Sequence, residues 1–255
     1  MIRFNSPRAR KIVFFVALLA AWQMLVWIGI WPEYIFPSPL GVAQTLARGI
    51  QNRTFIIGVA SSMQRIVVGF GISAVAGILL GLAIGRIKLL DETIGSVVMG
   101  LQALPSICWL PLALLWFGLS ETAILFVVIM GALLAITTAT EAGVKNTPPL
   151  YIRAARNLGA RGWKMYALVI FPAALPSIIT GMKLGWSFAW RSLMAAELLY
   201  VSLGLGQLLM MGRDLNDMNL VVAVMLVIIV IGLIVDRLVF TPIESRVRER
   251  WGLQG

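Results

Sequence analysis

Ionisable side chains inside a long apolar stretch are the residues of this sequence most able to do chemistry. Residues 176–199 are mainly apolar, yet they contain Lys183, Arg191 and Glu197. Such groups are costly in an apolar environment and usually face the interior of a helix bundle or water. A guanidinium can donate two parallel hydrogen bonds to an anion, so Arg191 is a candidate for contact with a small anion. An ion pair with another helix is the alternative for Arg191.

The helical period adds a neighbour to this group. At about 100° per residue, Lys183, Trp190 and Glu197 lie on nearly one face, and Arg191 lies on its flank. Trp190 is therefore a second candidate, and Glu197 could orient the arginine, gate the outer end or form a structural ion pair. Lys183 stands near one end, where its long side chain can reach water, so we expect a structural role for it.

Another set of polar residues is associated with two prolines. Pro105 and Pro111 interrupt the apolar stretch 94–117, and Gln102, Ser106 and Trp109 fall within one broad helical face. Proline frees backbone carbonyls that protein or cavity water must satisfy, and broken helices often line transport sites. These three residues are therefore candidates to line a pathway, and a kinked helix used only for packing is the alternative.

The composition indicates which class of protein must position these residues. Of 255 residues, 60% are hydrophobic and 13% charged, and the mean hydropathy is +0.92. A soluble globule of this size has too little polar surface for such a composition. With no histidine and one cysteine, Cys108, the sequence argues against zinc sites, a Ser-His-Asp triad and a disulfide scaffold. We expect a membrane protein with no cofactor and no metal, whose net charge of +10 reflects topology rather than nucleic-acid binding.

Several apolar stretches are long enough to cross a membrane as helices. They cover residues 12–30, 66–85, 94–117, 122–140, 176–199 and 220–240, the third broken by Pro105 and Pro111. Six spans place both termini on one side, which receives 15 of the 21 Lys and Arg residues, against four on the other. The positive-inside rule puts both termini in the cytoplasm. The expected fold class is an all-α integral membrane protein with six transmembrane helices.

The remaining segments complete the expected organisation. It consists of a cytoplasmic tail and first span (1–34), an external connector (35–65), a core of five spans (66–240) and a cytoplasmic tail (241–255). Residues 41–50 of the connector predict a short amphipathic helix, or else a plain loop. Small residues recur every fourth position at Ser73, Gly77, Gly81 and Gly85, which predicts a closely packed helix face.

The longest cytoplasmic loop, residues 141–175, contains a predicted short helix. Pro148 and Pro149 can end one helix and start another, because proline is tolerated in a first helical turn. Residues 150–158 then form a helix that ends at Gly159, a residue suited to the left-handed conformation after a helix. A short capped helix with apolar and basic faces favours docking of a soluble partner. A solvated loop is the alternative.

The same loop carries a spaced motif. Arg153-Ala154-Ala155 is followed after three residues by Gly159 and after nine more by Val169-Ile170-Phe171-Pro172. This resembles the EAA loop of binding-protein-dependent ABC importer permeases, Glu-Ala-Ala, three, Gly, nine, Ile-x-Leu-Pro, from which Arg153, Val169 and Phe171 depart. Stretches at 36–39, 104–121, 175–181 and 190–197 are similar to the nitrate, sulfonate, taurine and bicarbonate branch of that family. The resemblance covers about residues 35–240.

The resemblance implies a division of labour and a permease fold with a cytoplasmic coupling helix. Two permease subunits, here expected as a homodimer, form the pathway; two ATP-binding cassette subunits dock on the cytoplasmic loops; an external substrate-binding protein delivers the ligand. The sequence has no Gly-x-x-x-x-Gly-Lys-Ser/Thr phosphate loop, so we expect no ATP hydrolysis by this chain itself. The residues expected to couple to the ATPase are Arg153, Ala154, Ala155, Arg156, Gly159 and Pro172.

The resemblance also implies import of a small anion across the inner membrane of a prokaryote. An aliphatic sulfonate is the first choice, and nitrate, taurine or bicarbonate are alternatives. The expected pathway residues are Gln102, Ser106, Trp109, Trp190, Arg191 and Glu197. A secondary transporter driven by ions, a membrane enzyme and a channel or scaffold subunit are rival classes. Ion coupling would need carboxylates in the membrane, and Glu197 alone is convincing.

Overall fold

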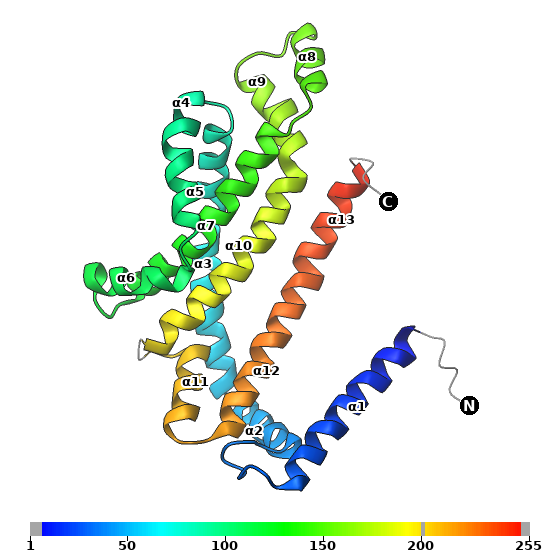
Figure 1. Cartoon of the computed structure of the whole chain (residues 1–255), viewed down its shortest axis with the longest axis vertical. Helices are drawn as coiled ribbons and strands as arrows, with labels where there is room; N and C mark the ends of the chain where they lie inside the picture. The colour runs from blue at the N-terminus through cyan, green and yellow to red at the C-terminus, as the bar shows by residue number, and fades with distance from the viewer. Residues whose placement is uncertain (1–6, 200–201, 251–255) are drawn as a thin grey trace. The chain divides into compact units, whose positions relative to one another are not determined.

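Helices joined by turns and bends make up the computed structural model of the chain, which describes residues 7–199 and 202–250 (Figure 1). These described residues contain no strand. The fold divides into two compact units, one of Met1–Ala60 with Leu203–Val230 and the other of Ser61–Ser202 with Ile231–Gly255.

The first unit surrounds the connector between the first two long helices. Its elements are α1 (Pro7–Ile28), α2 (Pro39–Gln51), α11 (Leu205–Asp214) and parts of α3 (Thr54–Ile84) and α12 (Met218–Val235). Ser38 caps α2, since its Oγ accepts a hydrogen bond from the Gly41 N–H at 3.1 Å, and Pro39 occupies the first helical position. This cap explains why the short helix expected at residues 41–50 forms.

The second unit contains most of the long helices. In chain order, after the rest of α3, they and the short segments between them are α4 (Lys88–Leu90), η1 (Asp91–Gly95), α5 (Ser96–Gln102), η2 (Ser106–Cys108), α6 (Trp109–Phe117), α7 (Glu121–Lys145), α8 (Pro149–Asn157), α9 (Trp163–Met165), η3 (Tyr166–Ile170), α10 (Phe171–Leu199), η4 (Asp236–Phe240) and α13 (Thr241–Arg250). The end of α12 leads into η4 without a break.

The number of helices able to span a membrane agrees with the six spans expected from the sequence if the bent pair is counted as one span. Among the described residues, five helices are long and apolar enough to cross a membrane, or six if one bent pair counts as a single span. They are Ala9–Ile28, Thr54–Ile84, Glu121–Lys145, Trp163–Leu199 and Met218–Val247, with the pair Lys88–Gln102 and Ser106–Phe117 bent by 99°.

Three details of the expected spans are corrected. The helix that contains the second expected span, α3, begins at Thr54 rather than at residue 66, because residues 55–60 are themselves apolar. The third apolar stretch breaks once, at residues 103–105, whereas Pro111 lies in the first turn of α6, where its missing N–H costs no helical hydrogen bond. The helix that contains the fifth expected span, α10, begins at Phe171 rather than at residue 176 and continues through Pro176.

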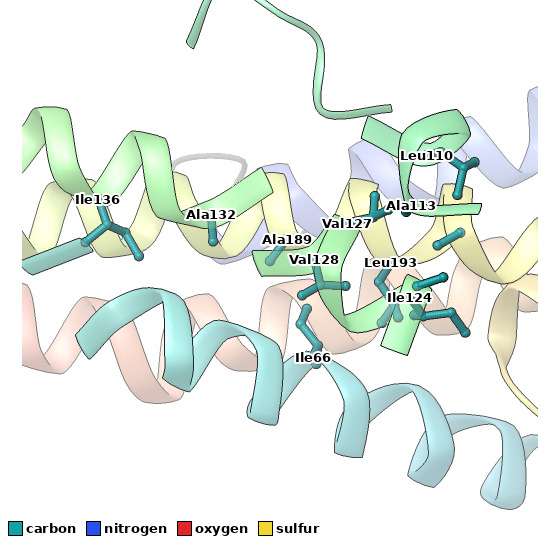
Figure 2. Packing of buried hydrophobic residues seen from close by; sticks show 12 residues of the cluster. Ile66, Leu110, Ala113, Ile124, Val127, Val128, Ala132, Ile136, Ala189 and Leu193 are labelled. Atoms are coloured by element: carbon teal, nitrogen blue, oxygen red, sulfur yellow. The ribbon is translucent and has the colours of Figure 1, made fainter. Parts of the chain in front are cut away.

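Small residues bring α3, α7 and α10 close together. A Cβ added to Gly81 of α3 would lie 2.5 Å from the Thr137 carbonyl oxygen, and one added to Gly185 of α10 would lie 2.8 Å from Ile136 Cγ1. The face predicted from the four-residue spacing is therefore packed, and its neighbour is α7 of the same chain. Figure 2 shows Ile66 of α3 pointing at Val128 of α7 within the buried cluster.

Candidate functional site

A cavity of about 420 Å³ lies where the break before α6 meets α7 and α10. Its polar lining comes from Gln102, Ser106 and Arg191, and Trp109 also lines it. The remaining lining residues are Ala103, Leu104, Pro105, Ile107, Met130, Gly131, Leu134, Ala135, Phe188 and Ala195. Four of the six residues expected along a pathway thus share one cavity, although they come from separate apolar stretches.

The break at residues 103–105 places two of these polar groups. α5 ends at Gln102, and Pro105 adopts φ −54° and ψ 136°, which no helix can continue. A new helical turn starts at Ser106, where the Cys108 N–H donates to the Pro105 carbonyl at 2.9 Å. Irregular backbone of this kind is tolerated at membrane depth when it lines a cavity or is buried in protein. The proline therefore positions Gln102 and Ser106 at the cavity wall.

Arg191 brings a positive charge to the same cavity. Its Cζ lies 5.4 Å from the ring centroid of Phe188, one turn earlier on α10, and its side chain is exposed. Among the residues that the structure describes, no carboxylate lies within ion-pair distance of Arg191. The ion-pair alternative thus finds no partner for Arg191 in that part of the chain. The guanidinium is available to an anion.

Trp190 and Glu197 are not among the residues that line the cavity. Trp190 packs against the buried core cluster and stacks on Trp186, with centroids 6.4 Å apart and an interplanar angle of 10°. Glu197 is completely buried, and both of its carboxylate oxygens accept hydrogen bonds from Ser62 Oγ at 2.8 Å. Arg65 Nη1 donates to the same carboxylate at 2.7 Å. The structural ion pair considered for Glu197 is therefore present.

Sequence reasoning missed Arg65, which is the last residue of the expected external connector (35–65). Its guanidinium also donates to Glu121 Oε1 and Oε2 at 2.6 and 2.7 Å and to Ser202 Oγ at 2.7 Å. It thereby ties α3 to the first turn of α7 and to the end of α10. The available signal was the presence of two carboxylates, Glu121 and Glu197, at the ends of apolar stretches with no basic residue beside them.

The expected docking helix is α8, which projects beyond the paired α7 and α10 (Figure 1). Pro149 is its first residue and Asn157 its last, and Gly159 follows with φ +83°, as expected for a residue after a helix end. Ala155 is 8% exposed and packs in a cluster with Ile170 of η3. Together these contacts fix α8 against the start of the next long helix.

The opposite face of α8 and its flanks have apolar side chains exposed. Leu150, Leu158 and Trp163 are 71%, 88% and 81% exposed. Of the residues expected to couple to a partner, Arg153, Ala154, Arg156 and Gly159 are exposed, and Pro172 lies partly buried in the first turn of α10. The sequence expectation of a capped helix with an outward apolar and basic surface agrees with this arrangement.

The fold is that of an ABC importer permease. The crystal structure of an amino acid ABC transporter with histidines matches with a TM-score of 0.65, at 18% identity, over 79% of this chain and 97% of that chain. The chain belongs to the family of binding-protein-dependent transport system inner membrane components, whose family model matches residues 73–248. It is thus a multi-pass permease subunit of an ABC importer, a family that works with an ATPase and a substrate-binding protein.

The relatives differ in the substrates for which they are named. A Methanocaldococcus jannaschii protein named as an ABC transporter permease is 35% identical, covering 85% of this chain and 82% of that protein. A nitrate import permease protein of Leptolyngbya laminosa is 32% identical, covering 93% of this chain and 86% of that protein. Others are named for taurine transport in Escherichia coli and for aliphatic sulfonates transport in Bacillus subtilis. Membership of this family sets aside the ion-coupled secondary transporter.

Proposed function

We propose that the cavity beside Arg191 is part of the pathway for a small anion, with an aliphatic sulfonate as the first choice. The observation that carries the proposal is a guanidinium with no carboxylate partner among the described residues, at the wall of a cavity of about 420 Å³. Nitrate, taurine and bicarbonate are the alternatives, and relatives are named for the first two of them.

The lining of the cavity supports a sulfonate because it has two chemical parts. Arg191, Gln102 and Ser106 can donate hydrogen bonds to the oxygens of an anion. Leu104 and Ile107 offer apolar surface to a short alkyl chain. Nitrate and bicarbonate have no alkyl group and would leave the apolar part of the lining without a matching ligand surface.

We also propose that α8 transmits the work of ATP hydrolysis from a docked ATPase. Its exposed Arg153, Ala154 and Arg156 would contact that subunit, together with Gly159 at the helix end. Ala155 would act indirectly, because it is buried and seats α8 on the cluster beneath. We expect a homodimer of this chain with two ATPase subunits, and both termini in the cytoplasm, as the distribution of basic residues favours.

The test of the pathway is uptake by the complex reconstituted in liposomes with its ATPase and binding protein. Ethanesulfonate should be imported in preference to nitrate and bicarbonate, which have no alkyl group. Arg191→Gln should lower uptake by about ten-fold or more, because a hydrogen bond to a charged group contributes about 1.5–3 kcal/mol. The control is Arg246→Gln, at an exposed arginine of α13. Uptake by Arg191→Gln equal to that of the control would show that the arginine does not serve the pathway.

A further inference from the structure

Three arginines share one pocket beside α8, and one of them, Arg86, comes from a distant part of the sequence. This pocket of about 320 Å³ is lined by Arg86, which follows α3, by Arg156 of α8 and by Arg161 in the loop before α9. The other lining residues are Ala160, Gly162, Met165 and Tyr166. The positive φ of Gly162, +53°, turns the loop that carries Arg161 back towards α9.

The carboxylates at this end of the helices are engaged with other basic residues. Lys145 Nζ lies 2.6 Å from Asp91 and 2.8 Å from Glu141. Lys88 lies 3.6 Å from Glu92. Within the described part of the chain, no acidic residue forms an ion pair with any of the three pocket arginines. Like charges gathered around one pocket repel each other, so an anion in the pocket would relieve an unfavourable arrangement.

Two of the pocket residues lie near the ends of candidate membrane spans. Arg86 comes two residues after the end of the span Thr54–Ile84, and Tyr166 lies near the start of the span Trp163–Leu199. Phosphate groups of a bilayer lie at this boundary of the hydrocarbon, where tryptophan and tyrosine are also enriched. Trp163 and Leu168, in the segment that lines one side of the pocket, are 81% and 70% exposed. Guanidinium groups and apolar side chains therefore occur together.

We propose that the arginine pocket binds the phosphate of an anionic phospholipid such as phosphatidylglycerol. Arginine recognises phosphate with paired hydrogen bonds, and basic pockets between spans on the cytoplasmic side bind lipid headgroups. The positive-inside rule assigns this end of the helices to the cytoplasm. The site is separate from the transport cavity, since it shares no lining residue with it. It shares Arg156 with the proposed ATPase contact, so Arg86 and Arg161, which lie outside that contact, are the residues that test it.

Native mass spectrometry of the full-length chain in detergent tests the proposal. The chain is titrated with phosphatidylglycerol, with phosphatidylcholine and with glycerol 3-phosphate, and phosphatidylglycerol should bind best. Arg161→Gln and Arg86→Gln should each weaken its binding about five-fold, which corresponds to about 1 kcal/mol per arginine. Lys88→Gln is the matched control, because it removes an 88% exposed charge close to Arg86 but outside the pocket. Thermal unfolding checks that each variant is folded. If one of the two arginine variants does not fold, the other one still tests the proposal.

Four results would overturn the lipid assignment. Phosphatidylglycerol binding by both arginine variants equal to that of the control would remove the pocket from the interaction. Equal binding of phosphatidylcholine would remove the requirement for net negative charge. Equal binding of glycerol 3-phosphate would assign the pocket to a free phosphate compound. Unchanged lipid binding by Arg161→Gln together with loss of the co-purifying ATPase would assign the arginines to an acidic protein surface.

Discussion

Replacing Arg65 by alanine should destabilise the protein strongly, because it would leave a buried carboxylate without its cationic partner. Glu197 is completely buried and accepts hydrogen bonds from Arg65 and Ser62. Removing one partner of a buried ion pair costs about 3–5 kcal/mol. The Glu121 side chain, the other partner of Arg65, is 53% exposed, so Glu121→Gln should cost about 0–1 kcal/mol. The two carboxylates therefore provide a buried case and an exposed control around the same guanidinium.

The assay is thermal unfolding in detergent followed by tryptophan fluorescence. For chains of this size, 1 kcal/mol shifts the midpoint by about 2–4 °C, so Arg65→Ala should lower it by about 10 °C and Glu121→Gln by about 3 °C or less. The double variant Arg65→Ala with Glu197→Gln should recover part of the loss, because the buried negative charge is gone and Ser62 can still donate a hydrogen bond. Equal losses for Arg65→Ala and Glu121→Gln, or no recovery in the double variant, would refute this reasoning.

Two further predictions concern packing and docking. Gly81→Val should lower the free energy of unfolding by about 1–3 kcal/mol, because its Cβ would meet the Thr137 carbonyl, whereas Gly71→Val, with no atom within 4 Å of the added Cβ, should leave the unfolding midpoint unchanged. Ala155→Leu should displace α8 and release the ATPase during co-purification, whereas Gly71→Val, in α3 and outside the proposed ATPase contact, should retain it; equal ATPase recovery from both variants would count against the proposed seating of α8.

The helices and the docking segment could be predicted from local sequence. Hydropathy identifies the spans because burial in lipid demands long apolar stretches, and Pro149 and Gly159 mark the ends of α8 by their backbone preferences alone. The cavity was partly predictable for the same reason, since a proline break brings backbone and polar side chains to one place. Local rules gave Pro111 the wrong role, because the effect of a proline depends on whether it lies in a first turn.

Pairings between distant residues could not be predicted in this way. Arg65 and Glu197 are separated by 132 positions, and only the packing of α3 against α10 brings them together. The same holds for the arginine pocket, whose members look like ordinary interfacial basic residues when each is considered alone. Helical periodicity describes which residues share a face of one helix, but it carries no information on which face of another helix they meet.

The close packing of α7 on α10 has a mechanical consequence. At Gly143, Gly181 and Gly185 the two helices are in direct contact, with no room for an added Cβ. Neither helix can therefore slide or bend without the other, and the α7–α10 pair moves as one rigid body, called the bar below. The bar is held at one end by α8, and Arg191 stands about 30 Å along it from the first residue of α10. Tilting the bar by about 5° about that end would sweep the guanidinium sideways by about 3 Å, roughly the length of one hydrogen bond.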